Sequence, residues 1–567
     1  MRKILFIILL LSLVSLLSAD PKTIVPGVTL ERFSSLNGEP QNINVARADL
    51  TNPQIHISVG LGDNKITSKG KPYGKEPVSR IAEKHNALLG VNADFFIMES
   101  FRDNLNFSLI DGEIVSEPQY NRRVMFIGRD NRIFFDIPKL ETKIYTENGK
   151  EINITGINRA RNTGDVILYT DRFAPSTLSK YDAYDVVIRP IIGDRLRPNC
   201  QIIATVEKIL PNTKNNTIEP NTFILSATLK TCPDIGCLSV GDMVTLDVRL
   251  YAKESLKDIV YATGGGPLLL EKGRINVTSI SENFKNDIAK GRAPRTAVGI
   301  NREGTELILL TCDGRSDYSK GLTLENLASF MKNLGAWNAM NFDGGGSTDM
   351  SVLGLVMNSP CETTERNVAN ALLVSSDYRG REINLAKDYS NLIFRGNSLY
   401  NLDEPTDNII WGTAGGVGYA DKDNIFHTTA KDRKGKIGFV HDGIKYVFNT
   451  EISNAPINDV SLEIAEKEET GSGIKYNCIA KLTDRNGNYM SFSPIFIYAE
   501  NGTCDRVRYT ADEKGEVKFS VLFYEKKSES SETDANGEII ETKEDTAEKP
   551  IKAIRFVLGN FSQTMEF

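Results

Sequence analysis

The chain has 567 residues, of which 40% are hydrophobic and 25% are charged, and its formal net charge is −7. This length and composition are typical of a globular protein with room for about three or four domains, and they exclude a largely disordered chain. The acidic balance makes nucleic acid a poor partner. The four histidines all lie outside the glycine-rich motifs described below, which argues against a Ser-His-Asp triad or a histidine-ligated zinc site.

The N-terminus has the residue order of a secretory signal. Arg2 and Lys3 precede an apolar run from Ile4 to Leu17, and small residues follow up to Ala19. The run is shorter than the roughly 20 residues that a membrane-spanning helix needs. We therefore predict a signal peptide at residues 1–19, no membrane span after its cleavage, and a protein that is secreted, periplasmic or at the cell surface.

Polar residues follow the first predicted helix. Residues 79–89 have helical spacing, and the segment 90–96, GVNADFF, comes directly after them. Asn92 and Asp94 place an amide and a carboxylate before two aromatic residues. The amide of Asn92 suits the recognition of sugar hydroxyls.

The next stretch has a different character. From about residue 141 to 250, short β-rich runs are broken by Asn, Gly and Pro, which predicts an all-β insertion. After it, Gly264, Gly265 and Gly266 precede the apolar residues 268–270 and sit at a predicted strand junction. Three consecutive glycines weaken local stability unless the backbone needs positive φ or a close approach by another group.

Two arginines stand at the mouth of the following strand. Arg292 and Arg295 lie in the segment 292–300, RAPRTAVGI, and Thr296 is next to the second of them. A guanidinium group binds phosphate or carboxylate with two parallel hydrogen bonds. These residues are candidate phosphate ligands.

A strand, a helix and a second strand are predicted between residues 306 and 342. The first strand ends in Asp313-Gly314-Arg315, Thr323 can cap the helix, and the second strand ends in Asp343 followed by three glycines. If the strands are parallel neighbours, both ends lie at one edge of the sheet, so Asp313, Arg315 and Asp343 converge.

The residues after Asp343 complete the candidate site. Gly344, Gly345 and Gly346 invite a close approach by a ligand, and Ser347 and Thr348 can bond sugar hydroxyls or simply satisfy the loop. Arg366 and Asn370, which precede the strand-like segment 371–376, either line the same pocket or end a loop.

Beyond residue 378 alternating strands predict a β-sandwich over residues 379–567, and residues 526–549 read as a charged excursion between strands. The predicted fold class is thus α+β: a catalytic domain at 20–378 with a mixed sheet and helices, interrupted by the β-rich insertion, and a C-terminal β-sandwich. The seven cysteines leave at least one unpaired, and Cys232 with Cys237 and Cys478 with Cys504 are disulfide candidates.

The ordered motifs resemble those of the phosphodiester glycosidases. They are NADFF (92–96), TGGGPLLL (263–270), RAPRTAVGI (292–300), CDGR (312–315), GLTLENLA (321–328), NFDGGGST (341–348) and ERNVANALLV (365–374). The resemblance implies hydrolysis of a sugar-1-phosphodiester, such as an N-acetylglucosamine-1-phosphodiester, on the sugar side, in the processing of cell-surface or exopolysaccharide glycans. One departure is visible, because Asp94 stands where members of this family often carry glycine.

Residue chemistry agrees with a glycosidase. Such enzymes use a pair of carboxylates, and arginines that neutralise a phosphate leaving group can supply much of the stabilisation. We assign Asp343 as nucleophile or base, Asp313 as its acid or base partner, and Arg295 with Arg315 as a phosphate clamp. Glu325 is a reserve carboxylate, although the first turn of a helix favours an acidic residue in any case.

Two other readings stay open at this point. A non-catalytic glycan-binding surface protein would use the same crevice without cutting, and a phosphodiesterase would attack phosphorus instead of carbon. No metal or other cofactor is expected, although a carboxylate-rich pocket has the oxygen ligands that a divalent cation prefers. The expected partner is a glycan or sugar-phosphodiester substrate.

Overall fold

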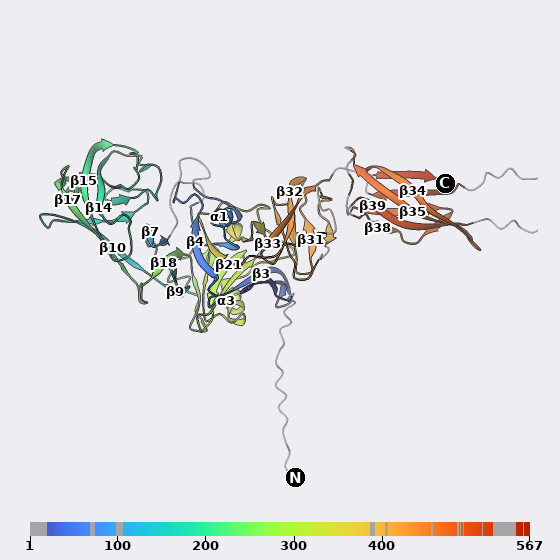
Figure 1. The fold of residues 1–567 in the computed structure, drawn as a ribbon, viewed down its shortest axis with the longest axis horizontal. Helices are drawn as coiled ribbons and strands as arrows, with labels where there is room; N and C mark the ends of the chain where they lie inside the picture. The colour runs from blue at the N-terminus through green and yellow to red at the C-terminus, as the bar shows by residue number, and fades with distance from the viewer. Residues whose placement is uncertain are drawn as a thin grey trace, which may run out of the picture. The chain divides into compact units, whose positions relative to one another are not determined.

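The computed structural model describes residues 20–67, 74–97, 106–385, 392–402, 406–454, 457–484, 487, 489–490, 493–512, 514–524, 551–558 and 561–567. The predicted signal peptide and the charged segment 526–549 lie outside these residues. The chain forms two compact units (Figure 1). The first unit contains the described residues up to Leu385 together with Leu402–Ile425 and Gly438–Val447, and the second contains the remainder.

Of the described residues 52% are in strands and 6% in helices, so the fold is mainly β and the prediction of an α+β class with a mixed sheet is wrong. The helices of the described residues are short. They are α1 (Val78–Lys84), α2 (Asn286–Lys290) and α3 (Leu324–Asn333), with 3₁₀ turns η1 (Pro233–Cys237) and η2 (Gly345–Ser347). None of the described helices has the length and apolar character that would let it cross a membrane.

An antiparallel sheet forms the centre of the first unit, in the order β1-β2-β3-β22-β21-β23-β19-β20. Its strands are β1 (Lys22–Val25), β2 (Val28–Leu36), β3 (Glu39–Asp49), β22 (Glu306–Cys312), β21 (Arg295–Ile300), β23 (Asn338–Asn341), β19 (Leu268–Glu271) and β20 (Arg274–Ile275). The predicted neighbours β22 and β23 are separated by β21, which pairs antiparallel with both. They are therefore parallel to each other, and their ends still lie at the same edge of the sheet.

A second sheet of the first unit carries strands in the order β29-β25-β24-β5-β26-β4. These are β29 (Ile410–Ala414), β25 (Leu355–Val356), β24 (Met350–Val352), β5 (Leu89–Asn92), β26 (Asn370–Ser376) and β4 (Ile55–Leu61). A smaller sheet has the order β7-β6-β18-β8-β9. Its strands are β7 (Glu113–Ser116), β6 (Ser108–Ile110), β18 (Ile259–Gly264), β8 (Val124–Gly128) and β9 (Ile133–Asp136).

The two larger sheets pack face to face, with a helix on each outer face. Leu307 and Leu309 of β22 share one core with β5 and β26, whereas Ile308 and Leu310 share another with α3. Helix α1 packs on the outer face of β26. Strands that are apolar on both faces suggested a parallel sheet covered by crossover helices. Here a second sheet covers one face and a single helix covers the other, so the same pattern arises in an antiparallel sheet.

The insertion is an eight-stranded sheet in the order β11-β10-β17-β15-β14-β16-β13-β12. Its strands are β11 (Glu151–Ile154), β10 (Lys139–Thr146), β17 (Met243–Tyr251), β15 (Cys200–Thr213), β14 (Ala183–Ile192), β16 (Phe223–Ala227), β13 (Val166–Tyr169) and β12 (Gly156–Ile157). The labelled strands β10, β14, β15 and β17 curve around one apolar core (Figure 1). Because β11 also contacts β13, the sheet nearly closes into a barrel.

Six more strands lie within residues 392–452. A three-stranded sheet has the order β28-β31-β30, with β28 (Leu399–Asn401), β31 (Ile425–Thr428) and β30 (Gly418–Ala420). The other three strands are β27 (Leu392–Phe394), β32 (Arg433–His441) and β33 (Ile444–Ile452). Two four-stranded antiparallel sheets then enclose a core of their own. The first has β34 (Ile457–Thr470), β35 (Gly473–Asp484), β39 (Glu516–Tyr524) and β37 (Gly502–Cys504), and the second has β38 (Arg508–Thr510), β36 (Pro494–Glu500), β40 (Ala553–Leu558) and β41 (Phe561–Glu566). All seven cysteines are free, so neither predicted disulfide is formed.

Candidate active site

Asp343 lies in the turn that follows β23, at the edge where the two large sheets meet. Its backbone N–H donates to the carbonyl of Ala93 over 2.9 Å, and the side-chain amide of Asn92 donates to its backbone carbonyl over 2.7 Å. The Oδ1 atom accepts from the N–H of Gly344 over 2.9 Å. The end of β5 thus fixes the backbone of Asp343 on both sides.

Asp343 is partly exposed, whereas Asp94 and Asp313 are buried. Burial raises its pKa to about 6, while the hydrogen bond from Ser347 and the charge of Arg366 act in the opposite direction. A carboxyl with this pKa is mostly ionised at neutral pH and can still exchange a proton. It has the electrostatic character of a reactive acid.

The glycines after Asp343 bring two arginines close to the backbone. Gly345 has φ +63°, and a Cβ on it would lie 3.2 Å from Nη2 of Arg315. A Cβ on Gly346 would overlap the guanidinium of Arg366. Arg366 also forms an ion pair with Glu362 and donates from Nη1 to the hydroxyl of Ser347 over 3.3 Å. The predicted need for close approach is met here by arginine side chains.

Arg315 occupies an exposed position beside this turn. It has a left-handed φ of +63°, and its Nη1 lies 3.8 Å from the sulfur of Cys361. Its guanidinium therefore lies beside the glycine turn and remains open to solvent. Arg315 and Arg366 are the two cations that the structure brings to the Asp343 turn.

The other predicted phosphate ligands are engaged elsewhere. Arg295 is buried and donates to the backbone carbonyls of Leu322, Ile288 and Gly291 over 2.6 to 3.0 Å. Burial lowers its pKa to about 10. Arg292 forms an ion pair with Glu39 and donates to the carbonyl of Gly321 over 3.1 Å. Both side chains hold the loops around α2 and α3 together.

Asp313 is 1% exposed at the end of β22. Its Oδ2 accepts from the amide of Asn42 over 2.6 Å and from the N–H of Ser359 over 2.8 Å, and its Oδ1 accepts from Asn358 over 3.1 Å. Burial raises its pKa to about 7, and these hydrogen bonds lower it. These hydrogen bonds fix Asp313 against β3, which carries Asn42, and against the loop that carries Asn358.

Asp94 is a second buried carboxyl near Asp343, since it follows Ala93, whose carbonyl accepts from the N–H of Asp343. It is 2% exposed, its N–H donates to the side chain of Asn370 over 2.9 Å, and its Oδ1 accepts from the N–H of Phe95 over 2.8 Å. Burial raises its pKa to about 8, the charge of Arg122 lowers it, and the charge of Asp343 raises it further. Asp94 is therefore largely protonated at neutral pH.

The first glycine triplet packs around this carboxyl. A Cβ on Gly264 would overlap the side chain of Asp94, and one on Gly265 would lie 2.7 Å from the ring of Phe342. Gly266, at φ +110°, exchanges hydrogen bonds with Asn341, with its N–H 2.7 Å from that residue's carbonyl oxygen. These glycines therefore allow β18 to approach Asp94 and the strand that leads to Asp343.

The remaining predicted residues support the same edge. The hydroxyl of Thr296 donates to Asn92 over 2.7 Å, and the amide of Asn370 donates to Thr263 over 3.0 Å. Ser347 and Thr348 are buried in the turn. Glu325 is exposed in the first turn of α3, where the side chain of Thr323 caps the helix as predicted.

Sequence reasoning missed Arg122 and the acid pair of Asp349 and Glu365. Asp349 is buried beside Glu365, and burial together with repulsion from that residue raises the pKa of Asp349 well above its usual value. Glu365 accepts two hydrogen bonds from Ser79. Asp349 comes directly after the glycine turn, and this position could have identified it. The residues around Arg122 form no motif, so the local sequence indicates no role for it. Among the described residues, no cluster of His, Cys, Asp and Glu has an arrangement that would hold a metal ion.

Comparisons with known proteins identify a family for the part of the chain that holds Asp343. Residues 208–375 match the phosphodiester glycosidase family. The uncharacterized protein YomE, from an SPbeta prophage of Bacillus subtilis (strain 168), is 31% identical over 146 residues, which are 25% of this chain and 21% of that protein. Mouse N-acetylglucosamine-1-phosphodiester alpha-N-acetylglucosaminidase is 39% identical over 74 residues, which are 13% of this chain and 14% of that protein.

The chain thus spans about a fifth or less of the length of these curated relatives. A solved structure of a hypothetical protein from Synechocystis has a similar fold, with a TM-score of 0.52 and 22% identity over 62% of each chain. The family match covers the Asp343 turn, the β21 and β22 strands and Arg366. The chain therefore carries a domain of the phosphodiester glycosidase family.

Proposed function

We propose that this protein is a secreted glycoside hydrolase that cleaves a sugar-1-phosphodiester on the sugar side, in the processing of cell-surface or exopolysaccharide glycans. An N-acetylglucosamine-1-phosphodiester is the first substrate to test. The family domain supports a glycosidase in general. The observation that carries the specific proposal is the partly exposed Asp343 in a glycine turn flanked by Arg315 and Arg366.

Asp343 acts at the anomeric carbon, as nucleophile or as the base that activates water. Its ionised form is needed for either role, and a pKa of about 6 supplies that form at neutral pH. The bond between the anomeric carbon and the bridging oxygen breaks. Water supplies a hydroxyl to the carbon and a proton to the departing phosphate oxygen, so the products are a free sugar and a phosphomonoester.

Arg315 and Arg366 neutralise the departing phosphate. Both reach the glycine turn, and fixed cations aimed at developing negative charge stabilise a transition state without reorganising. A phosphomonoester is a good leaving group, so less protonation is required than for an alcohol. This replaces the earlier assignment of Arg295 to the clamp, because its donors already bond backbone carbonyls.

Asp94 serves as the second carboxyl of the site in its neutral form. It shares the electrostatic environment of Asp343, and a proton on it keeps a second negative charge away from the reacting carboxylate. Asp313 fixes the end of β22 through its bonds to Asn42, Asn358 and Ser359. In this scheme Asp313 is a positioning residue.

The test is hydrolysis of UDP-N-acetylglucosamine and simpler N-acetylglucosamine-1-phosphodiesters in ¹⁸O-labelled water, with and without a chelator. We expect wild type to release free sugar that carries the label at its anomeric hydroxyl. Asp343→Asn should lower kcat/KM by on the order of 1,000-fold or more, since it removes the reacting carboxylate. Asp317→Asn, at an exposed carboxylate of the loop after Asp313, is the matched control and should retain activity.

Label in the phosphate would show attack at phosphorus and overturn the proposal in favour of a phosphodiesterase. Binding of these compounds without turnover by wild type would favour a glycan-binding protein. Activity that survives in Asp343→Asn would remove this residue from the mechanism even if the reaction is the proposed one.

A further inference from the structure

A polar cavity of about 320 Å³ lies between the loop after β7 and the first strands of the insertion. Its volume is at the lower end of the range for small-molecule sites, about 300 to 1,000 Å³. Three chain segments line it, and none of them contributed to the candidate site predicted from sequence. The segments are 117–122, 137–142 and 154–157.

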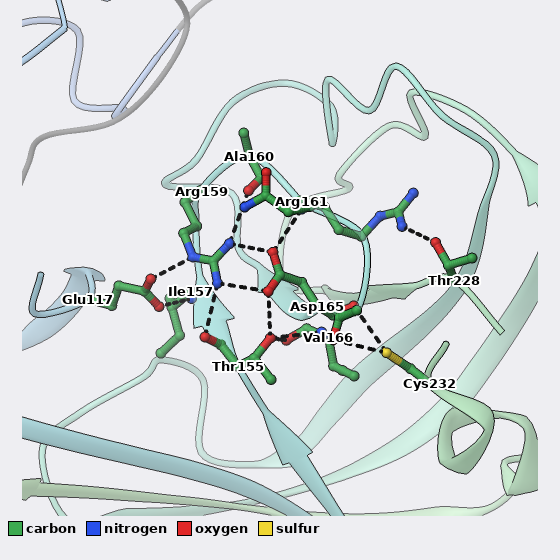
Figure 2. Close-up of polar contacts among 12 residues, drawn as sticks. Glu117, Thr155, Ile157, Arg159, Ala160, Arg161, Asp165, Val166, Thr228 and Cys232 are labelled. Carbon is green, nitrogen blue, oxygen red and sulfur yellow. Dashed lines mark hydrogen bonds and ion pairs between the residues drawn. The ribbon is translucent and has the colours of Figure 1, made fainter. Parts of the chain in front are cut away.

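One wall of the cavity is held by a network of charged side chains (Figure 2). Arg159 donates to Glu117 over 2.6 Å, to Asp165 over 2.7 Å and to the carbonyl of Thr155 over 3.1 Å. The second oxygen of Glu117 accepts from the N–H of Ile157 over 2.8 Å. Because Glu117, Thr155 and Ile157 line the cavity, this network fixes the shape of the wall before any ligand arrives.

The same segment that carries Glu117 also brings an aromatic ring and an amide to the cavity. Tyr120 is 54% exposed, and Asn121 is exposed beside it. Both have left-handed backbone conformations, with φ of +56° and +54°, which is unusual for consecutive residues and rare for tyrosine. Strained backbone of this kind persists where the surroundings hold it, and it is frequent at binding sites.

Arg122 connects the cavity with the candidate active site. This residue lines the cavity, its guanidinium lies 4.0 Å from the ring centroid of Phe284 and 4.9 Å from that of Tyr120, and it donates to the carbonyl of Glu282 over 3.2 Å. Its charge also acts on Asp94, which is the neighbour of Asp343. One residue of the cavity lining therefore interacts electrostatically with the candidate active site.

Two charged residues of the cavity lining are paired within the protein. Glu117 is paired with Arg159, and Lys139 is paired with Glu141 over 2.6 Å. The lining also presents the exposed ring of Tyr120, over which the guanidinium of Arg122 lies at 4.9 Å, and the exposed residue Asn121 with its amide. Aromatic faces and neutral hydrogen-bonding groups match the apolar face and the hydroxyls of a sugar ring.

We propose that this cavity is a saccharide subsite, in which a neutral sugar unit of the substrate beyond the scissile bond stacks on Tyr120. This inference rests on the proposed function for its place in the reaction, but saccharide binding by the cavity can be measured without turnover. The subsite would make the enzyme prefer a phosphodiester that carries further sugar units over one with a small aglycone.

Methyl NMR of the full mature chain carrying Asp343→Asn tests the subsite directly, because Ile137, Ile154 and Ile157 line the cavity. The probes are glucose, galactose, mannose and N-acetylglucosamine, together with cellobiose and N,N′-diacetylchitobiose. We expect at least one probe to shift these methyl signals. Tyr120→Ala should weaken its binding by about fivefold to tenfold, since a stacked ring is lost.

Two further variants sharpen the test. Asn121→Gly removes an amide and keeps the left-handed backbone, so it should weaken binding with the fold intact. Tyr181→Ala removes a tyrosine that is 72% exposed and does not line the cavity, so binding should not change. The inference is overturned if no probe shifts the three methyl signals, or if Tyr120→Ala and Asn121→Gly bind as Tyr181→Ala does. If the cavity binds a saccharide but wild type hydrolyses no phosphodiester, the proposed function is wrong and saccharide binding by the cavity still stands.

Discussion

Two carboxyls of the candidate site have opposite protonation states for physical reasons that lie in their surroundings. Burial raises the pKa of Asp343, but the hydrogen bond from Ser347 and the charge of Arg366 stabilise its charged form, so the pKa rises only to about 6. Asp94 is almost completely buried, and the nearby charge of Asp343 adds to the cost of ionising it, so its pKa rises to about 8. Environments that separate two pKa values in this way are typical of glycosidase sites.

The pH dependence of activity follows from these values. We expect kcat/KM for a sugar-1-phosphodiester to rise as Asp343 ionises near pH 6 and to fall as Asp94 ionises near pH 8. Asp94→Asn mimics the neutral carboxyl, so it should keep most activity at pH 7 and lose the alkaline fall. A profile of this variant that still falls near pH 8 would contradict the assignment.

Asp94→Asn should also change how the stability of the protein depends on pH. Because the folded-state pKa of Asp94 lies above its ordinary value of 3.8, the folded state binds the extra proton, and stability falls as the pH rises from about 4 towards 8. Asp94→Asn lacks this titration. Its melting temperature should therefore decline less than that of wild type between pH 5 and pH 8.5, whatever the substrate is.

The glycine turn around η2 is the element on which the site depends most closely. Gly346→Ala would push a Cβ into the guanidinium of Arg366, which is the flexible end of a side chain and can move away. We expect Arg366 to lose its bond to Ser347 and kcat/KM to fall by on the order of 10- to 100-fold, with a small change in melting temperature. Steady-state kinetics and thermal unfolding measure both quantities.

Gly471→Ala is the matched control, because an added Cβ there meets no atom within 4 Å and the backbone is not left-handed. It should leave both quantities unchanged. If Gly346→Ala retained full activity, the close approach of Arg366 to the turn would have no catalytic role. A large drop in the melting temperature of Gly346→Ala would instead show that Gly346 is needed for folding.

The molecule as a whole has separate apolar cores in its two units. The C-terminal sheets enclose Phe523, whereas Phe330 of α3 belongs to a core of the first unit. We expect calorimetry to resolve two unfolding transitions. Phe523→Ala should lower only one of them and Phe330→Ala only the other, each by about 3 to 5 kcal/mol of unfolding free energy. A shift of both transitions by either variant would show that the units unfold together.

Several local features were readable from the sequence. The strand at 306–312 and the capped helix after Thr323 are confirmed by β22 and α3, because hydrophobic spacing and capping depend on neighbouring residues only. The helix predicted over residues 79–89 is shorter, since α1 ends at Lys84 and β5 begins at Leu89. The glycine triplets also marked close backbone approaches, although the groups that approach were not identifiable.

The sequence by itself determined the family domain, through the order of its motifs, and placed Asp343 at the end of a strand. Only the tertiary structure decided that β21 separates β22 from β23, that Arg295 serves backbone carbonyls, and that Asp94 lies beside Asp343. The physical reason is the distance along the chain over which each interaction acts. Spacing and caps are set within a few residues, whereas strand pairing, burial and the charge felt by a carboxyl depend on residues that are hundreds of positions apart.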